Sequence, residues 1–149
     1  MYLNLLELVK DKDYFVLTTN VDHQFQRADF DKKRMFYTQG DYGLLQSVDP
    51  EIPNTFDNEE IVMKMMEDQD FLKNSERIFE LPEDGNIRME ISSDLIPLCP
   101  DDGRKMPTNL RADDRFVEDA GWHAANQRYN EFCSEHEKQH VLYLEEAQI

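Results

Sequence analysis

The sequence predicts an α/β fold in which strands near both ends of the chain bracket a long middle section. Residues 14–19 are aromatic and β-branched and are hydrophobic on both faces, which is typical of a strand inside a sheet covered by helices. A further strand is predicted at residues 140–144. The residues between them lack one continuous period, so we expect a parallel sheet with a smaller lobe inserted into it.

The first elements follow from local patterns. Leucines between residues 3 and 8 predict a short amphipathic helix, and a charged break at residues 10–13 separates it from the strand at 14–19. Polar residues follow that strand directly, namely Asn20, Asp22 and His23. Ligands of α/β sheets bind outside the carboxyl ends of strands, so these residues lie where a site is expected.

The middle of the chain begins with a second short strand at residues 34–38. Residues 39–43 read Gln-Gly-Asp-Tyr-Gly, and the two glycines predict a loop that bends tightly or approaches another segment closely. Residues 47–56 are rich in turn formers. Asn58 is then predicted to cap a helix with Glu59 and Glu60 in its first turn, and its apolar face contains Ile61, Val62, Met65 and Met66.

The later elements are more widely spaced. Residues 68–85 are charged and poorly periodic, whereas Ile87, Met89 and Ile91 alternate in the manner of a half-exposed strand. Residues 97–107 are irregular. A helix packed on one side against a core is predicted from apolar and aromatic residues recurring at spacings of three and four, namely Trp122, Ala125, Tyr129, Phe132 and His136.

Charge and cysteine content exclude several classes of function. The chain has 32 acidic and 16 basic residues, a formal net charge of −16, which repels both a nucleic-acid backbone and an anionic membrane surface. That charge either keeps the surface solvated or selects a partner electrostatically. Only Cys99 and Cys133 occur, and no signal peptide or run of about 20 apolar residues is visible, so we expect a soluble cytoplasmic protein.

An ordered set of short motifs resembles one enzyme family. Residues 18–22 read Thr-Thr-Asn-Val-Asp, Arg27-Ala28 follows, and then Gln39-Gly40. This set resembles the sirtuin (Sir2-like) pattern of a TQN-x-D motif, an RAG turn, an HG catalytic motif and paired cysteines. The chain is most similar to the macrodomain-linked bacterial sirtuins. This resemblance extends from about residue 5 to residue 144, and its later matching segments are residues 109–111 (Asn-Leu-Arg) and 116–117 (Phe-Val).

The resemblance implies a partial Rossmann-like, NAD-binding domain formed by residues 1–46 and 109–149, with residues 47–108 as the small lobe. It also implies an enzyme that breaks the nicotinamide glycosidic bond of NAD and passes ADP-ribose to a protein, in that branch a lipoyl-carrying one. Asn20, Asp22 and Gln39 are then the expected catalytic residues, and Thr19, Asn20 and Asp22 are expected to contact the cofactor.

Gln39 departs from the family pattern, which has a histidine before the glycine. The histidine acts as a base in deacylation, whereas a glutamine side chain cannot accept a proton at neutral pH and can only orient a substrate. We therefore expect ADP-ribosyl transfer in preference to deacylation. An NAD-dependent deacylase is kept as an alternative.

The metal site of the family is also altered. A structural zinc site needs four ligands, usually thiolates, and the corresponding positions here are Ser47, Glu51, Cys99 and Asp102. We expect no structural zinc, and a loose lobe unless other packing replaces the metal. Asp29 stands where the family has glycine, and there it is expected to strain the backbone and repel a pyrophosphate.

No glycine-rich phosphate-binding turn precedes Tyr14, and the loops that the family uses later for ribose and adenine would lie beyond residue 144. We therefore expect a chain truncated at both ends that binds NAD weakly or not at all. Two interpretations stay open: a fragment of an ADP-ribosyltransferase, or a non-catalytic acidic remnant that binds other proteins. The sequence does not predict the oligomeric state.

Overall fold

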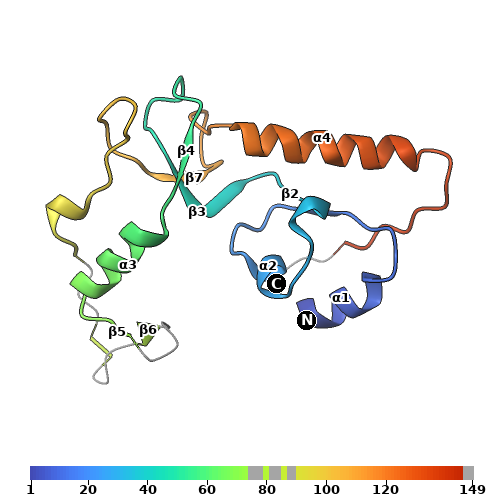
Figure 1. The fold of residues 1–149 in the computed structure, drawn as a ribbon, viewed down its shortest axis with the longest axis horizontal. Helices are drawn as coiled ribbons and strands as arrows, with labels where there is room; N and C mark the ends of the chain where they lie inside the picture. The colour runs from blue at the N-terminus through green and yellow to red at the C-terminus, as the bar shows by residue number, and fades with distance from the viewer. Residues whose placement is uncertain (74–78, 81–84, 87–89, 146–149) are drawn as a thin grey trace. The chain divides into compact units, whose positions relative to one another are not determined.

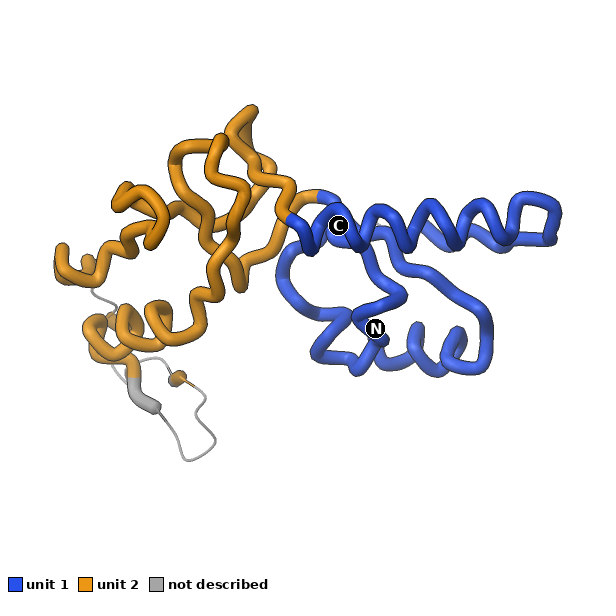
Figure 2. The backbone as a smooth tube through the Cα atoms, turned by 45° about the horizontal axis from the view of Figure 1, so that its top comes forward, with its two compact units in different colours: residues 1–38, 120–149 blue, residues 39–119 orange. Residues whose placement is uncertain are grey.

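A computed structural model describes residues 1–73, 79–80, 85–86 and 90–145 (Figure 1). The fold is mixed α/β, as predicted, with one parallel strand pair and an antiparallel sheet. The chain forms two compact units (Figure 2). The first unit comprises residues 1–38 and 120–149, and the second unit is the continuous segment 39–119.

The first unit contains the parallel pair β1 (Val16–Thr18) and β2 (Met35–Tyr37). Both strands were predicted, and both are shorter than the sequence pattern suggested. The helix α4 (Ala120–Glu135) was also predicted, and it packs on β2 through the rings of Phe36 and Trp122, whose centroids are 5.0 Å apart. Leu17 in β1 is 50% exposed, so the expected burial of this strand on both faces is wrong for that residue.

A small core in the first unit forms around Ala28, Phe30 and Met35. The predicted N-terminal helix, α1 (Tyr2–Val9), packs one face against this core, and α2 (Gln24–Arg27) contributes Phe25. Aromatic rings meet edge to face there, with centroids 4.9 Å apart for Tyr2 and Phe25. A single 3₁₀ turn, η1 (Lys32–Arg34), leads into β2.

The end of α2 is closed by two backbone hydrogen bonds. Phe30 N–H donates to the Phe25 carbonyl at 3.1 Å, and Asp29 N–H donates to the Gln26 carbonyl at 3.0 Å. This is the Schellman arrangement, which requires a left-handed residue after the helix. Asp29 is that residue, with φ +64°, so the backbone strain expected at Asp29 is present.

The second unit is built on an antiparallel sheet that the sequence did not predict. Its strand order is β4 (Thr55–Asp57), β3 (Gly40–Gln46), β7 (Thr108–Leu110). The expected loop at residues 39–43 is thus mostly strand. The expected close approach is confirmed at Gly40, which has φ +99° and where a Cβ would clash with the Asn109 carbonyl oxygen.

A buried polar network fastens the segment after β7 to this sheet. The Asn109 side-chain amide donates to Gln46 Oε1 at 2.7 Å and to the Val117 carbonyl at 3.0 Å. Val117 N–H donates to the same Gln46 oxygen at 3.0 Å, and Gln46 Nε2 donates to the Arg115 carbonyl at 2.6 Å. Both buried amides are therefore satisfied, which makes their burial tolerable.

The predicted helix after Asn58 is α3 (Glu59–Asp68), with Glu59 and Glu60 in its first turn. Asn58 is the N-cap residue, but its side chain donates to the Tyr42 carbonyl at 2.7 Å and does not cap the helix. The short strands β5 (Leu72–Lys73) and β6 (Phe79–Glu80) and the turn η2 (Ser93–Leu95) follow. Residues 87 and 89 of the predicted strand at 87–91 lie outside the described residues.

The strand predicted at residues 140–144 is wrong. This segment is irregular, and its apolar side chains are exposed, with Leu142 at 80% and Tyr143 at 85%. Its hydrophobic pattern suits a strand, but no strand in the described ranges pairs with it. In the part of the chain that the structure describes, no helix has the length and apolar character needed to cross a bilayer.

Candidate functional site

The carboxyl end of β1 is fixed by its parallel neighbour. The Thr18 carbonyl accepts hydrogen bonds from Thr38 N–H at 3.0 Å and from the Thr38 hydroxyl at 3.3 Å. The Thr18 hydroxyl in turn accepts from Asn20 N–H at 3.0 Å. Because the two strands are parallel, their carboxyl ends lie at the same end of the sheet, and the segments that follow them leave the sheet there. Ligands of α/β folds usually bind at this end.

Thr19, Asn20 and Asp22 lie together on the turn after β1. The Asn20 side-chain amide is half-buried and donates to the Tyr2 hydroxyl at 3.4 Å, which links the turn to α1. Asp22 is exposed, and its Oδ1 accepts from Gln24 N–H at 3.3 Å. His23 between them adopts φ +59° at the start of α2. The turn thus presents an amide and a carboxylate of defined position.

Gln39 belongs to the second unit. It follows Thr38 in the chain, and its carbonyl accepts from Arg111 N–H at 3.0 Å, which anchors the start of β3 beside the end of β7. Gln39 is half-buried. Its catalytic role stays a prediction.

Three of the four positions that correspond to the zinc ligands lie together. Ser47 is fully buried, and its hydroxyl donates to Asp102 Oδ2 at 2.6 Å. The pKa of Asp102 is lowered from its ordinary value, first by that hydroxyl, then by Arg104 N–H, and also by the thiol of the buried Cys99. The fourth position, Glu51, is exposed, and its own N–H donates to Asp49 Oδ1 at 3.1 Å.

Further polar contacts support this turn. Arg104 pairs with Asp49, with 2.7 Å between Nη1 and Oδ2, and the Asn54 side-chain amide donates to Asp101 Oδ2 at 2.7 Å. Gly103 N–H donates to the Cys99 carbonyl at 2.8 Å. Other packing therefore holds this part of the second unit. Within the described residues, no cluster of three or more His, Cys, Asp or Glu side chains is arranged to hold a metal ion.

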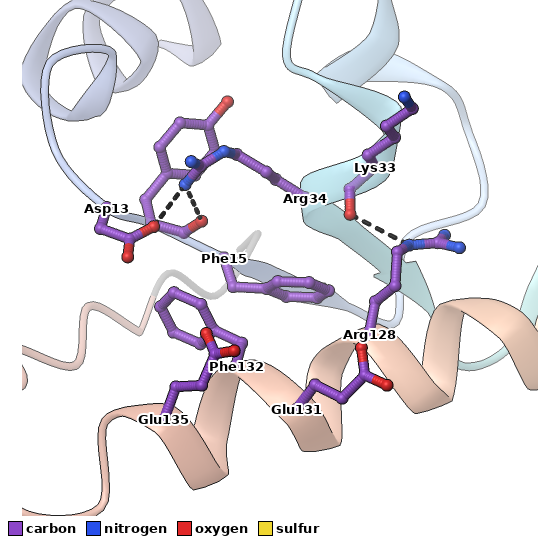
Figure 3. A pocket seen from close by; sticks show the side chains of 9 residues that line it. Asp13, Phe15, Lys33, Arg34, Arg128, Glu131, Phe132 and Glu135 are labelled. Carbon is purple, nitrogen blue, oxygen red and sulfur yellow. Dashed lines mark hydrogen bonds and ion pairs between the residues drawn. The ribbon is translucent and has the colours of Figure 1, made fainter.

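A hollow of about 240 Å³ in the first unit is lined by residues that the sequence patterns did not indicate as site residues (Figure 3). Phe15 and Phe132 lie against one another there, and Glu131 and Glu135 project from α4. A second hollow, of about 310 Å³, lies in the second unit and is lined by residues of β3, β7 and the segment after β7. Neither hollow is lined by Asn20, Asp22 or Gln39.

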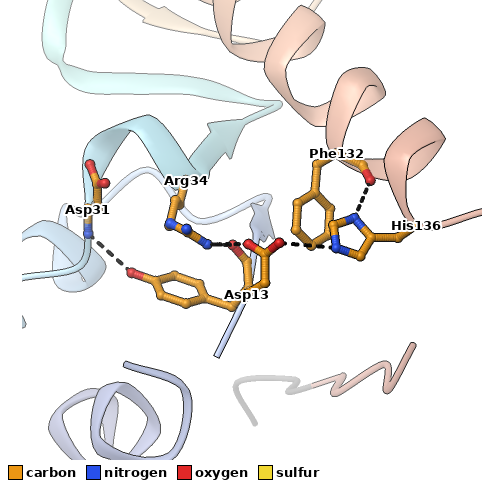
Figure 4. Close-up of polar contacts among 6 residues, drawn as sticks. Asp13, Asp31, Arg34, Phe132 and His136 are labelled. Atoms are coloured by element: carbon orange, nitrogen blue, oxygen red, sulfur yellow. Dashed lines mark hydrogen bonds and ion pairs between the residues drawn. The ribbon is translucent and has the colours of Figure 1, made fainter. Parts of the chain in front are cut away.

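Three polar side chains beside the first hollow contact one another, namely Asp13, Arg34 and His136 (Figure 4). Asp13 lies 2.7 Å from Arg34 Nη1 and 3.1 Å from His136 Nε2, while His136 Nδ1 lies 2.7 Å from the Phe132 carbonyl oxygen. The hydrogen bond from Arg34 is the main cause that lowers the pKa of Asp13. These contacts connect the residue that follows α4, His136, to the segment that precedes β1. The positions of Asp13 and Arg34 follow no local period, so no sequence signal indicated these contacts.

No family model matches the chain. The chain is 36% identical over 146 residues, 97% of its length, to a protein of Staphylococcus aureus named protein ADP-ribosyltransferase. It spans 41% of the length of that relative. The similarity therefore extends over both units of this chain and over less than half of the relative.

Proposed function

We propose that this chain is part of a sirtuin-type, NAD-dependent protein ADP-ribosyltransferase. The observation that carries the proposal is the 36% identity, over nearly the whole chain, to a protein with the name protein ADP-ribosyltransferase. The motifs at residues 18–22, 27–28 and 39–40 resemble sirtuin motifs and support the same activity. The acceptor that the resemblance implies is a lipoyl-carrying protein.

The turn after β1 has suitable chemistry for the nicotinamide and ribose half of NAD. Asn20 carries both a donor and an acceptor for a carboxamide, and Asp22 carries an exposed carboxylate that can accept from ribose hydroxyls. Bound NAD would supply an ADP-ribose unit whose glycosidic carbon gains positive charge as nicotinamide leaves. A carboxylate and an amide oxygen held in place by the fold stabilise such a charge.

Gln39 determines which of two reactions we propose. It can orient a substrate by hydrogen bonding but cannot act as a base at neutral pH. Deacylation of the sirtuin kind needs a base at this position, whereas transfer to a strong nucleophile on a protein does not depend on it. We therefore propose ADP-ribosyl transfer as the activity.

The test is incubation of the purified chain with biotin-labelled NAD and a lipoylated carrier protein, with the unlipoylated carrier as a second acceptor. Label on the acceptor supports the proposal, and Asp22→Asn and Asn20→Ala should each reduce it at least tenfold. Asp11→Asn is the matched control, because Asp11 is exposed and precedes β1. Equal labelling by Asp22→Asn and by the unchanged chain would refute the assigned site.

A second candidate function is a non-catalytic acidic protein that binds other proteins, which the net charge of −16 favours. Calorimetry with NAD separates the two candidates. Binding that disappears in Asp22→Asn supports the transferase. Absence of binding at millimolar NAD, even when an N-terminal segment with a glycine-rich phosphate-binding turn is supplied, supports the interaction protein.

A further inference from the structure

The side chain of Asn20 is held at one end only. Its amide nitrogen, Nδ2, donates to the Tyr2 hydroxyl at 3.4 Å, and its backbone N–H donates to the Thr18 hydroxyl at 3.0 Å. No hydrogen bond joins Asn20 Oδ1 to any residue that the structure describes. Among those residues, Gln26 Oε1 is the only buried side-chain oxygen or nitrogen without a partner, so Asn20 Oδ1 reaches solvent. The amide therefore presents an open acceptor.

Aromatic packing fixes the Tyr2 ring that holds this amide. Tyr2 is the first residue of α1 and packs against the core of the first unit. Its ring meets the ring of Phe25 in α2 edge to face, with 4.9 Å between centroids, and Phe25 meets Phe30 in the same manner at 5.1 Å. A ring that is already held by such packing loses little freedom when its hydroxyl makes a hydrogen bond. The packing of α1 and α2 thus sets the position of the Tyr2 hydroxyl.

The two ends of an amide side chain recognise different groups. The nitrogen is a donor, and the oxygen is an acceptor. Because the Tyr2 hydroxyl holds Nδ2, the end of the Asn20 amide that is turned away from Tyr2 is the oxygen. A ligand with an N–H or O–H group fits that end. A carboxylate has only acceptors, so it would meet the Asn20 oxygen with no hydrogen between them.

We propose that Tyr2 is a positioning residue that keeps the oxygen of Asn20 toward the ligand, so that the turn after β1 selects a carboxamide over a carboxylate. This inference rests on the proposed function, in which Asn20 contacts nicotinamide. Nicotinamide carries an amide N–H that can donate to Asn20 Oδ1, whereas nicotinic acid has the same ring with an ionised carboxylate. A site that accepts from a ligand N–H rejects the analogue without it, because the acceptor of the site is then left unpaired.

The probes are free nicotinamide and free nicotinic acid, titrated separately into the isotope-labelled chain and followed by NMR chemical shifts. Neither molecule has a phosphate, so the measurement needs no phosphate-binding turn and uses the chain as it is. We expect shift changes at the backbone amides of residues 19–22. The Kd of nicotinamide should be about tenfold lower than that of nicotinic acid, the effect of roughly one hydrogen bond.

Tyr2→Phe removes the hydroxyl and keeps the ring that packs on Phe25. The amide of Asn20 can then turn and offer either end, so the ratio of the two Kd values should fall to about one. Loss of a purely structural contact would weaken the binding of both molecules by the same factor and leave the ratio unchanged. An unchanged ratio therefore overturns the proposal, and so does a chain that binds neither molecule.

Tyr14→Phe is the matched control. The Tyr14 hydroxyl also makes a hydrogen bond of 3.4 Å, accepting from Asp31 N–H, and the Tyr14 ring packs edge to face on Phe30. Tyr14 precedes β1, whereas Asn20 follows it. This variant loses an equivalent bond in the same unit, so its Kd ratio should equal that of the unchanged chain. A ratio near one in both variants overturns the proposal, because it would show a general loosening of the first unit.

The labelling of an acceptor protein with NAD is a separate measurement. If the unchanged chain labels an acceptor but Tyr2→Phe keeps the Kd ratio, only the role of Tyr2 is overturned. If no acceptor is labelled but the ratio falls in Tyr2→Phe alone, the role of Tyr2 is supported and ADP-ribosyl transfer is not.

Discussion

The hydroxyl of Ser47 donates a hydrogen bond of 2.6 Å to the carboxylate of Asp102. Ser47 is fully buried. Cys99, which lies on the same turn as Asp102, is 2% exposed. These residues occupy three of the positions where the family resemblance implies zinc ligands. Hydrogen bonding therefore connects the segment directly after β3, which carries Ser47, to the turn that carries Cys99 and Asp102. In the family resemblance, a metal ion is expected to make that connection.

Replacing Ser47 by alanine should lower the Tm of the second unit. The change removes the donor of the shortest hydrogen bond to the half-buried Asp102 carboxylate, and it also removes the hydroxyl that accepts from Asp49 N–H at 3.0 Å, so two hydrogen bonds at a buried residue are lost. Thermal denaturation followed by circular dichroism measures the effect. Ser93→Ala is the control, because Ser93 is exposed. Equal Tm values for the two variants would show that the bond contributes nothing.

The same bond predicts a dependence of stability on pH. The pKa of Asp102 is lowered below its unfolded value of 3.8, mainly by the Ser47 hydroxyl. A carboxyl group with a lowered folded pKa contributes stability that is fully present above its unfolded pKa and is lost as the pH falls through the folded pKa. Urea unfolding of the unchanged chain should therefore show decreasing stability as the pH falls below about 4.

Asp102→Asn should lose less stability than the unchanged chain over that acid range, because asparagine does not titrate. Asp13 also has a lowered pKa, so Asp13→Asn provides a comparison in the first unit. If Asp102→Asn follows the same acid profile as the unchanged chain, the Ser47 to Asp102 contact does not contribute to the pH dependence.

Gly40→Ala should prevent the second unit from folding normally. A Cβ at this position would clash with the Asn109 carbonyl oxygen and lie 3.0 Å from the Phe116 ring. The φ of +99° adds a cost of about 1–2 kcal/mol for a residue with a side chain. Urea unfolding and the dispersion of amide signals in NMR spectra measure the loss.

Gly103→Ala is the matched control for this experiment. Gly103 also has a positive φ, +73°, but a Cβ there has no neighbour within 4 Å. It should therefore show only the conformational cost of about 1–2 kcal/mol. Similar losses of stability in the two variants would mean that the approach of β3 to β7 is not as close as the structure has it.

Local sequence patterns predicted the elements whose residues contact one another within a short segment. α1, α3 and α4 follow from helical spacing, and β1 follows from its aromatic and β-branched residues. β3 could not be predicted in this way, because Gly40, Asp41 and Gly43 are poor strand formers. Its strand conformation depends on pairing with β7, which is distant in the sequence, and on the polar network around Gln46 and Asn109.

The segment at residues 140–144 shows the opposite error. Its continuous run of apolar residues suits a strand, yet a strand exists only where a neighbouring strand supplies hydrogen bonds. For the candidate site, the sequence identified the turn that carries Asn20 and Asp22. It could not show that Asn20 contacts Tyr2, because that contact depends on how α1 packs against the core.

Asp29→Gly should stabilise the first unit. Asp29 has φ +64° in the Schellman turn that ends α2, a conformation that glycine adopts without a steric penalty. We expect a gain of about 1 kcal/mol in the free energy of unfolding, measured by urea denaturation. Asp29→Asn separates conformation from charge, since it removes the carboxylate and keeps the side chain, and it should change stability less than Asp29→Gly.

Asp70 provides an internal replicate of this prediction in the second unit. It has φ +63° after α3, where Phe71 N–H donates to the Met66 carbonyl and Asp70 N–H to the Glu67 carbonyl, as in the turn at Asp29. Asp70→Gly should therefore give a gain of similar size. A loss of stability in both glycine variants would contradict the conformational explanation, because it would mean that the aspartate side chains themselves stabilise these two helix ends.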